Sequence, residues 1–168
     1  KDSLTGLLNR RGFDDAAQRL IVQARCSRKP VSALMCDIDM FKQVNDTQGH
    51  EGGDAAIRHV ADIVAKALES VPDSVVGRQG GDEFAILVVG RSIRELAQFA
   101  DDIRMAIESA PMTWRDEALF LTISLGVAIS ASEDADITSL LSRADQALYE
   151  AKKRGRNRVQ VTAAADAA

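Results

Sequence analysis

The sequence is poor in cysteine and contains no long apolar run. Cys26 and Cys36 are the only cysteines in 168 residues, and they lack the paired spacing of a zinc site or a redox motif. Cys36 stands inside an apolar segment, where a small buried hydrophobe is expected. No apolar run is long enough to cross a bilayer, and the start at Lys1-Asp2 does not resemble a signal peptide. We therefore expect a cytoplasmic domain belonging to a longer protein, with no membrane segment in this chain.

Aromatic residues are also scarce, and neither sign of charge dominates. They make up 4% of the chain, and 21 basic against 25 acidic residues give a net charge of -4. No basic stripe with interleaved aromatics is present, so nucleic acid is not an expected partner. An apolar content of 46% excludes a disordered polymer and predicts one domain with its own core. We expect this domain to span residues 1–162, with a frayed tail at 163–168.

The spacing of apolar residues predicts alternating helices and strands. Segment 40–53 is too rich in Gly, Asn and Asp for one helix and indicates a helical turn plus a loop. Gly80-Gly81 suits the tight turn of a hairpin. Helices are expected at 10–27, 54–69, 92–109 and 136–154, and strands at 31–39, 74–79, 83–90, 118–130 (broken at Gly126) and 158–161. This order predicts an α/β fold with a mixed central sheet flanked by helices.

Acidic residues stand at the ends of two predicted strands. Asp37 and Asp39 close the first, and Asp82 and Glu83 open the strand after the glycine turn. If these strands are neighbours, the carboxylates meet at one edge of the sheet, where repulsion raises their pKa values unless a cation joins them. Hard oxygen ligands favour Mg²⁺ or Mn²⁺. The alternative is that each acid is merely solvated.

Two features near these acids suit a nucleotide. Gly80 and Gly81 have no side chains, so a base or a phosphate could lie on their backbone. Lys42, one turn beyond the first acids, could meet a phosphate. The alternatives are an ordinary hairpin and a surface lysine.

Three further polar residues suit recognition of a purine. Asn45 and Asp54 together could read a guanine edge, because a carboxylate accepts from the N1 and N2 donors of guanine. Asp54 could equally be a helix N-cap. His50 could be a ligand, a base contact or an ordinary loop residue.

Several motifs occur in a fixed order along nearly the whole chain: DSLTGLLNRRGF (2–13), DIDMFKQVNDTQGHEGGD (37–54), RQGGDEF (78–84), ISLGVA (123–128) and ADQALYEAKKRGRNRV (144–159). This set resembles the GGDEF family of diguanylate cyclases. The resemblance implies a palm-like nucleotide-cyclase fold with a sheet of about five strands. LTGLLNRR is interpreted as structural, tying the first helix to the body.

The resemblance also implies roles for individual residues, none of which is substituted. Asp37, Asp82 and the Ile38 carbonyl match metal ligands, and Glu83 is a site residue of less certain role. Asp82 matches the proposed general base and Lys42 the stabiliser of transition-state charge. The remaining matches are phosphate contacts at Phe41 and Lys42, nucleoside contacts at Asn45, His50 and Asp54, and terminal-phosphate contacts at Lys152 and Arg156.

The activity implied is condensation of two GTP molecules into cyclic di-GMP with release of pyrophosphate, assisted by two metal ions. One domain offers one nucleotide site, so two domains must face each other as a homodimer. An upstream sensor or regulatory domain is also implied. The alternatives are a silent GTP-binding regulatory module and a cyclase with a mixed adenine–guanine product, which Asp54 disfavours.

One family feature is missing. Many GGDEF cyclases carry an Arg-x-x-Asp inhibitory site for their own product shortly before the signature glycines. The matching window here is Val71-Pro72-Asp73-Ser74, with neither the arginine nor the aspartate in register. We therefore expect no tight product binding at this position.

Overall fold

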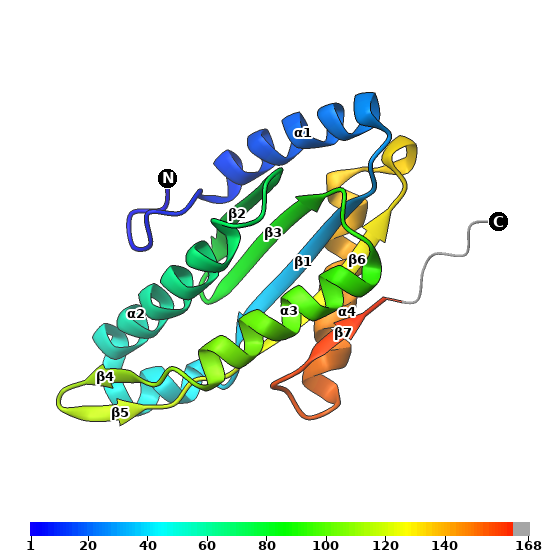
Figure 1. Cartoon of the computed structure of the whole chain (residues 1–168). Helices are drawn as coiled ribbons and strands as arrows, with labels where there is room; N and C mark the ends of the chain where they lie inside the picture. Colours follow the sequence, from blue (N-terminus) through cyan, green and yellow to red (C-terminus); the bar gives the residue numbers. More distant parts are fainter. Residues whose placement is uncertain (163–168) are drawn as a thin grey trace.

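A five-stranded mixed sheet forms the centre of the fold in the computed structural model, which describes residues 1–162 (Figure 1). The strand order is β2-β3-β1-β6-β7, with β2 at Ser74–Gly80, β3 at Glu83–Val89, β1 at Val31–Ile38, β6 at Ile123–Ser130 and β7 at Val159–Val161. Neighbouring strands are antiparallel except for the parallel pair β6 and β7. The predicted fold class is confirmed. The expected tail at 163–168 lies outside the described residues.

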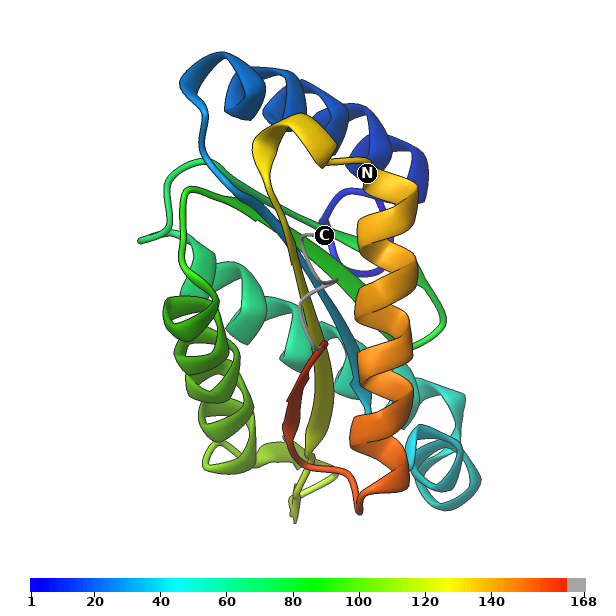
Figure 2. The ribbon, with the colours of Figure 1, turned by 90° about the vertical axis from the view of Figure 1, so that its right-hand side faces the viewer.

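Helices cover both faces of this sheet (Figure 2). Side chains of α2 (Phe41–Leu68) and α3 (Ile93–Glu108) pack with Leu34, Cys36 and Ile38 on one face. Side chains of α1 (Arg10–Ser27) and α4 (Ile137–Lys153) pack with Ala33 and Met35 on the other. Because successive strand residues alternate between faces, β1 is buried along its whole length.

Three helices begin at side-chain caps. Asn9 accepts from the Gly12 N–H at the start of α1, and Asp136 accepts from the Ser139 N–H at the start of α4. Ser92 and Glu95 form a reciprocal capping box at α3, so the predicted start of this helix is confirmed. A short 3-10 turn, η1 (Ser132–Asp134), precedes α4.

The expected loop within 40–53 is wrong, because α2 continues through this segment. Only Gly49 departs from helical geometry, with φ 74° and ψ 172°, and it kinks α2 between two helical parts. Asp54 lies inside the second part and is not an N-cap. Glycine content had suggested a loop, but Gly52 and Gly53 are buried helical residues that admit close neighbours.

The hairpin between β2 and β3 is present, although its turn is shifted from the predicted position. Gly80 still pairs with Glu83, so the two turn residues are Gly81 and Asp82. A bulge between Arg78 and Gly80 causes the shift by adding Gln79 to one strand. The turn therefore places Asp82 at its tip.

The strand expected at 118–130 is two strands, and its break is not at Gly126. The small hairpin of β4 (Met112–Trp114) and β5 (Glu117–Leu119) precedes β6, and sequence reasoning missed β4. Gly126 lies within β6, where a Cβ would collide with the α4 backbone at Ala144 and Leu148. Its lack of a side chain allows the close approach of α4 to the sheet.

The N-terminal segment joins α1 to the sheet. The Arg78 N–H donates to the Leu8 carbonyl at 2.8 Å, and the Arg78 guanidinium lies 3.2 Å from the Asp2 carboxylate. This agrees with the structural role expected of the LTGLLNRR block. Between residues 1 and 162, every helix is too short or too polar to span a membrane.

Candidate functional site

A cavity of about 460 Å³ lies where β1 ends, α2 begins and α4 ends. The antiparallel pairing of β1 with β3 brings Asp37 opposite Glu83 and next to Asp82. The two strands are therefore neighbours, which is the condition under which the sequence predicted that these carboxylates meet. Most of the predicted site residues line this cavity: Asp37, Ile38, Phe41, Lys42, Asn45, Asp82, Lys152 and Arg156. Residues from three separate parts of the sequence therefore meet at one place.

Asp37 is the most strongly perturbed acid of the cavity. It is only 8% exposed, and Lys152 Nζ lies 3.0 Å from its Oδ2 atom. Burial raises the pKa of Asp37 to about 6, with the Asp82 charge adding to the rise and Lys152 opposing it. The site therefore disfavours an isolated negative charge on Asp37 and favours an added cation.

The two signature acids lie in different positions. Asp82 lines the cavity, and burial raises its pKa while its own backbone N–H and Lys152 act in the opposite direction. Glu83 is not among the lining residues, although it is the register partner of Asp37. Burial also raises the pKa of Glu83, followed by the charges of Asp37 and Asp145. Asp82 is thus the better placed of the two to contact a ligand in the cavity.

The start of α2 lies at the cavity. Its N-cap residue Met40 has a left-handed φ of 55° and supplies no side-chain cap. The first backbone N–H groups of a helix have no partner within the helix and carry a partial positive charge, so they attract anions. Phe41 and Lys42, the first residues of α2, both line the cavity.

The predicted nucleoside-binding residues all lie on α2 but do not share one wall. Asn45 lines the cavity and lies against Gly53, where a Cβ would collide with its Oδ1 atom. This contact sets Asn45 beside the second part of α2, next to Asp54. His50 and Asp54 are exposed and outside the cavity lining. A base that contacts them must extend from the cavity along α2.

The glycine turn is open on its outer side. Gly80 has φ 151° and Gly81 has φ 51°, and a Cβ at either position would have no neighbour within 4 Å. Both residues are exposed and lie outside the cavity lining. Their freedom from side chains therefore leaves backbone that a ligand can approach directly.

The donor set of the cavity fits a hard divalent cation. Asp37 and Asp82 supply carboxylate oxygens, and Ile38 also lines the cavity, although its side chain belongs to the core. Within residues 1–162, no group of three or more His, Cys, Asp or Glu side chains could alone hold a metal. Mg²⁺ characteristically takes one or two carboxylates and completes its shell with water and substrate phosphates. Two acids beside the start of a helix match that mode of binding.

Asp39 is a site residue whose role sequence reasoning missed. It was expected only as one of the strand-end acids, whereas its buried carboxylate accepts three hydrogen bonds. The donors are the Thr122 hydroxyl at 2.7 Å, the Ser124 hydroxyl at 2.6 Å and the Asn157 backbone N–H at 2.9 Å. Asp39 therefore connects β6 and the turn after α4 beside the cavity. This leaves Asp37 as the acid of this strand end that can bind a cation.

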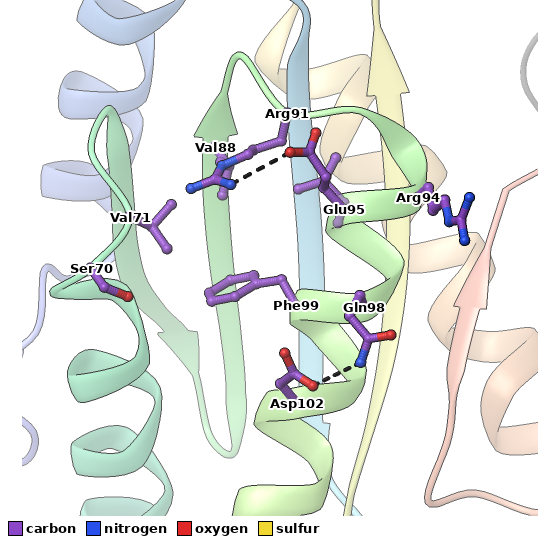
Figure 3. A pocket seen from close by; sticks show the side chains of 10 residues that line it. Ser70, Val71, Val88, Arg91, Arg94, Glu95, Gln98, Phe99 and Asp102 are labelled. Carbon is purple, nitrogen blue, oxygen red and sulfur yellow. Dashed lines mark hydrogen bonds and ion pairs between the residues drawn. The ribbon is translucent and has the colours of Figure 1, made fainter.

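A second cavity, of about 450 Å³, lies between the end of α2 and α3 (Figure 3). Among its lining residues, Arg91 contacts Glu95 at 3.7 Å and Gln98 donates to Asp102 at 2.8 Å. Val71 lines this cavity at the position where the inhibitory motif has arginine.

Asp73 and Ser74 of the inhibitory window each have a partner within the described structure. Asp73 pairs with Lys29 at 3.8 Å, and the Ser74 hydroxyl donates to the Val71 carbonyl at 2.6 Å. The window therefore offers the second cavity neither the arginine nor the aspartate of that motif.

Comparison with known proteins gives consistent matches over nearly all of this chain. The response regulator PleD of Caulobacter vibrioides (strain NA1000 / CB15N) is 39% identical over 160 residues, and the diguanylate cyclase DosC of Escherichia coli (strain K12) is 38% identical over 161 residues. These alignments cover 94% and 95% of this chain but only 35% and 34% of the relatives. The chain thus spans about a third of the length of these curated relatives.

The solved structures agree. The GGDEF domain of DgcB from Caulobacter crescentus, in complex with c-di-GMP, aligns with a TM-score of 0.88 at 35% identity, covering 96% of this chain and 94% of that one. The family model described as "Diguanylate cyclase, GGDEF domain" matches residues 1–158. The chain therefore belongs to the GGDEF domain family.

Proposed function

We propose that this domain is a diguanylate cyclase that condenses two GTP molecules into cyclic di-GMP and releases pyrophosphate. The observation that carries the proposal is the convergence of Asp37 and Asp82 with the start of α2 and the cations Lys152 and Arg156 in one cavity. Paired acids next to an anion site suit phosphoryl transfer to a nucleotide. The name of DosC, the description of the family model and the c-di-GMP bound to the DgcB domain support this activity.

Different residues of the cavity have different roles in the reaction. The first-turn N–H groups of α2 and the Lys42 ammonium hold the triphosphate, while Lys152 and Arg156 reach its terminal part. The 3′-hydroxyl of one GTP attacks the α-phosphorus of the other, and pyrophosphate leaves. Asp82 takes the hydroxyl proton, since its carboxylate lines the cavity in which the nucleotide is proposed to bind.

Asp37, Asp82 and the Ile38 carbonyl are the residues that would hold Mg²⁺ or Mn²⁺. When bound, such an ion supplies charge neutralisation on the phosphate oxygens and lowers the pKa of the attacking hydroxyl. The raised pKa of Asp37 supports this role, because the site favours an added cation.

Catalysis requires two copies of the domain. Residues 1–162 form one cavity with this set of residues, and joining two GTP molecules requires two nucleotides to face each other, so the active form is a symmetric pair. In a longer protein, an upstream sensor or regulatory segment would bring the pair together. DgcB has been solved with a coiled coil attached to its GGDEF domain, and SiaD in complex with its activator SiaC, which supports regulation of this kind.

Incubation with GTP and Mg²⁺, followed by identification of the products by mass spectrometry, tests the proposal. Cyclic di-GMP and pyrophosphate are expected, with a rate per domain that rises with protein concentration as pairs form. Binding of GTP without any product at high protein concentration would instead indicate the silent regulatory module.

A further inference from the structure

The turn after α4 adopts a costly backbone conformation next to the phosphate end of the cavity. Arg156 has φ 62° and Asn157 has φ 45°, both in the left-handed region that residues other than glycine seldom occupy. Arg156 is exposed and lines the cavity, so its reach depends on how its backbone is held. A conformation of this kind persists only where surrounding contacts enforce it.

The first contact that holds this turn comes from within the site. The Asn157 backbone N–H donates to Asp39 Oδ2 at 2.9 Å. Asp39 is only 7% exposed. Its Oδ1 atom accepts from the Ser124 hydroxyl of β6, and its Oδ2 atom accepts from the hydroxyl of Thr122, the residue just before β6. The acceptor is thus itself fixed, since its position is set by three hydrogen bonds.

A second contact comes from α3, on the outer side of the turn. Arg104 Nη1 donates to Asn157 Oδ1 at 2.9 Å and to Glu108 Oε2 at 2.7 Å. Asn157 Nδ2 in turn donates to Glu108 Oε1 at 2.8 Å, which closes a ring of three side chains. The Arg104 side chain is only 14% exposed, so this charged network is partly shielded from water. Asn157 is therefore held on both sides, by its backbone and by its side chain.

We propose that Asn157 is a positioning residue that directs Arg156 toward the terminal phosphates of the substrate, with Arg104 and Glu108 as its outer support. Asn157 acts through the backbone of the residue before it and does not itself touch the nucleotide. The inference rests on the proposed GTP site, and it adds to that site a group on α3 outside the family motifs described above.

A double-mutant cycle tests this role. Affinity for a non-hydrolysable GTP analogue and for GMP is measured by calorimetry for the parent, Asn157→Gly, Arg156→Ala and the double variant. Glycine accepts the left-handed conformation but cannot bond to Arg104 or Glu108. Asn157→Gly is expected to weaken binding of the GTP analogue about tenfold, to leave GMP binding unchanged, and to add no further loss in the Arg156→Ala background.

Two further variants sharpen the result. Arg154→Ala removes an exposed cation from the same end of α4 without touching the ring, and is expected to change neither affinity. Arg104→Gln removes the outer support of Asn157 without changing the turn itself, and should reproduce the selective loss of affinity for the GTP analogue. This variant keeps the test decisive if circular dichroism shows that Asn157→Gly is unfolded.

Two results would overturn the positioning role while leaving the GTP site intact. One is that Asn157→Gly lowers the affinity for the GTP analogue and for GMP equally, and the other is that the affinity losses of the two single variants add in the double variant. A folded parent that binds neither nucleotide would overturn the proposed function, and this inference with it.

Discussion

Lys152 Nζ lies 3.0 Å from Asp37 Oδ2, so α4 supplies a counter-ion to the buried acid at the end of β1. This single ammonium does not fully compensate the burial of Asp37, because the pKa of that carboxyl is still raised to about 6. The site thus holds more negative charge than its own lysine balances. It is prepared for a further cation, at a cost to the stability of the metal-free protein.

The first prediction concerns stability and pH in the absence of metal. Because the folded pKa of Asp37 is about 6 against an ordinary 3.8, the folded state binds this proton more tightly than the unfolded chain. The contribution of Asp37 to stability is therefore full below about pH 4 and is lost as the pH rises through 6. Asp37→Asn should be more stable than the parent at pH 7 by about 1–2 kcal/mol, or a few degrees in Tm.

Thermal melts of both proteins in chelator, from pH 4 to pH 7.5, check this. The difference in Tm between the parent and Asp37→Asn should fall toward zero as the pH approaches 4. A difference of constant size across that range would show that charge on Asp37 is not its cause.

Guanine selectivity is the second prediction. Asp54 can accept from two donors of guanine that adenine does not present, so the parent should use GTP in preference to ATP by about 10- to 100-fold. Asp54→Ser removes the charge and keeps a hydroxyl that can donate, and should narrow this ratio. Asp46→Ser, at another exposed acid of α2, is the matched control and should leave the ratio unchanged. Equal use of both nucleotides by the parent would contradict the assignment of Asn45 and Asp54.

The third prediction is weak feedback by the product. Val71 and Ser74 stand where the inhibitory motif has arginine and aspartate, and Asp73 is engaged by Lys29. Cyclic di-GMP titrated into the domain, with a non-hydrolysable GTP analogue filling the active site, should show no tight binding. Strong binding that persists under these conditions, and that Asp73→Ala or Ser74→Ala weakens, would show that the window does form a product site.

Much of the fold was predictable because its elements have strong local signals. The apolar run before Asp37 predicted a strand buried on both faces, and Ser92 predicted the start of α3. The sequence left open whether the strand that ends at Asp37 and the strand that begins at Glu83 are neighbours, and the pairing of β1 with β3 answers this.

The errors lie where the local signal was absent or misleading. The β4–β5 hairpin turns at Arg115 and Asp116, both left-handed without a glycine to mark the turn. Gly52 and Gly53 suggested a loop, although they serve close packing inside α2. The role of Asp39 depends on Asn157, 118 residues away in sequence, which no local pattern reveals.

The most direct test of the proposed activity compares three variants in one assay of cyclic di-GMP formation from GTP and Mg²⁺. Asp37→Asn and Asp82→Asn each remove one charge from the cavity without removing volume, and should lower turnover at least about 100-fold while the protein stays folded. Asp145→Asn removes a charge near Glu83 outside the cavity and should retain activity close to that of the parent. The proposed activity predicts that both cavity variants lose turnover while Asp145→Asn keeps it. Product formation at the parent's rate by either folded cavity variant would contradict the proposed activity.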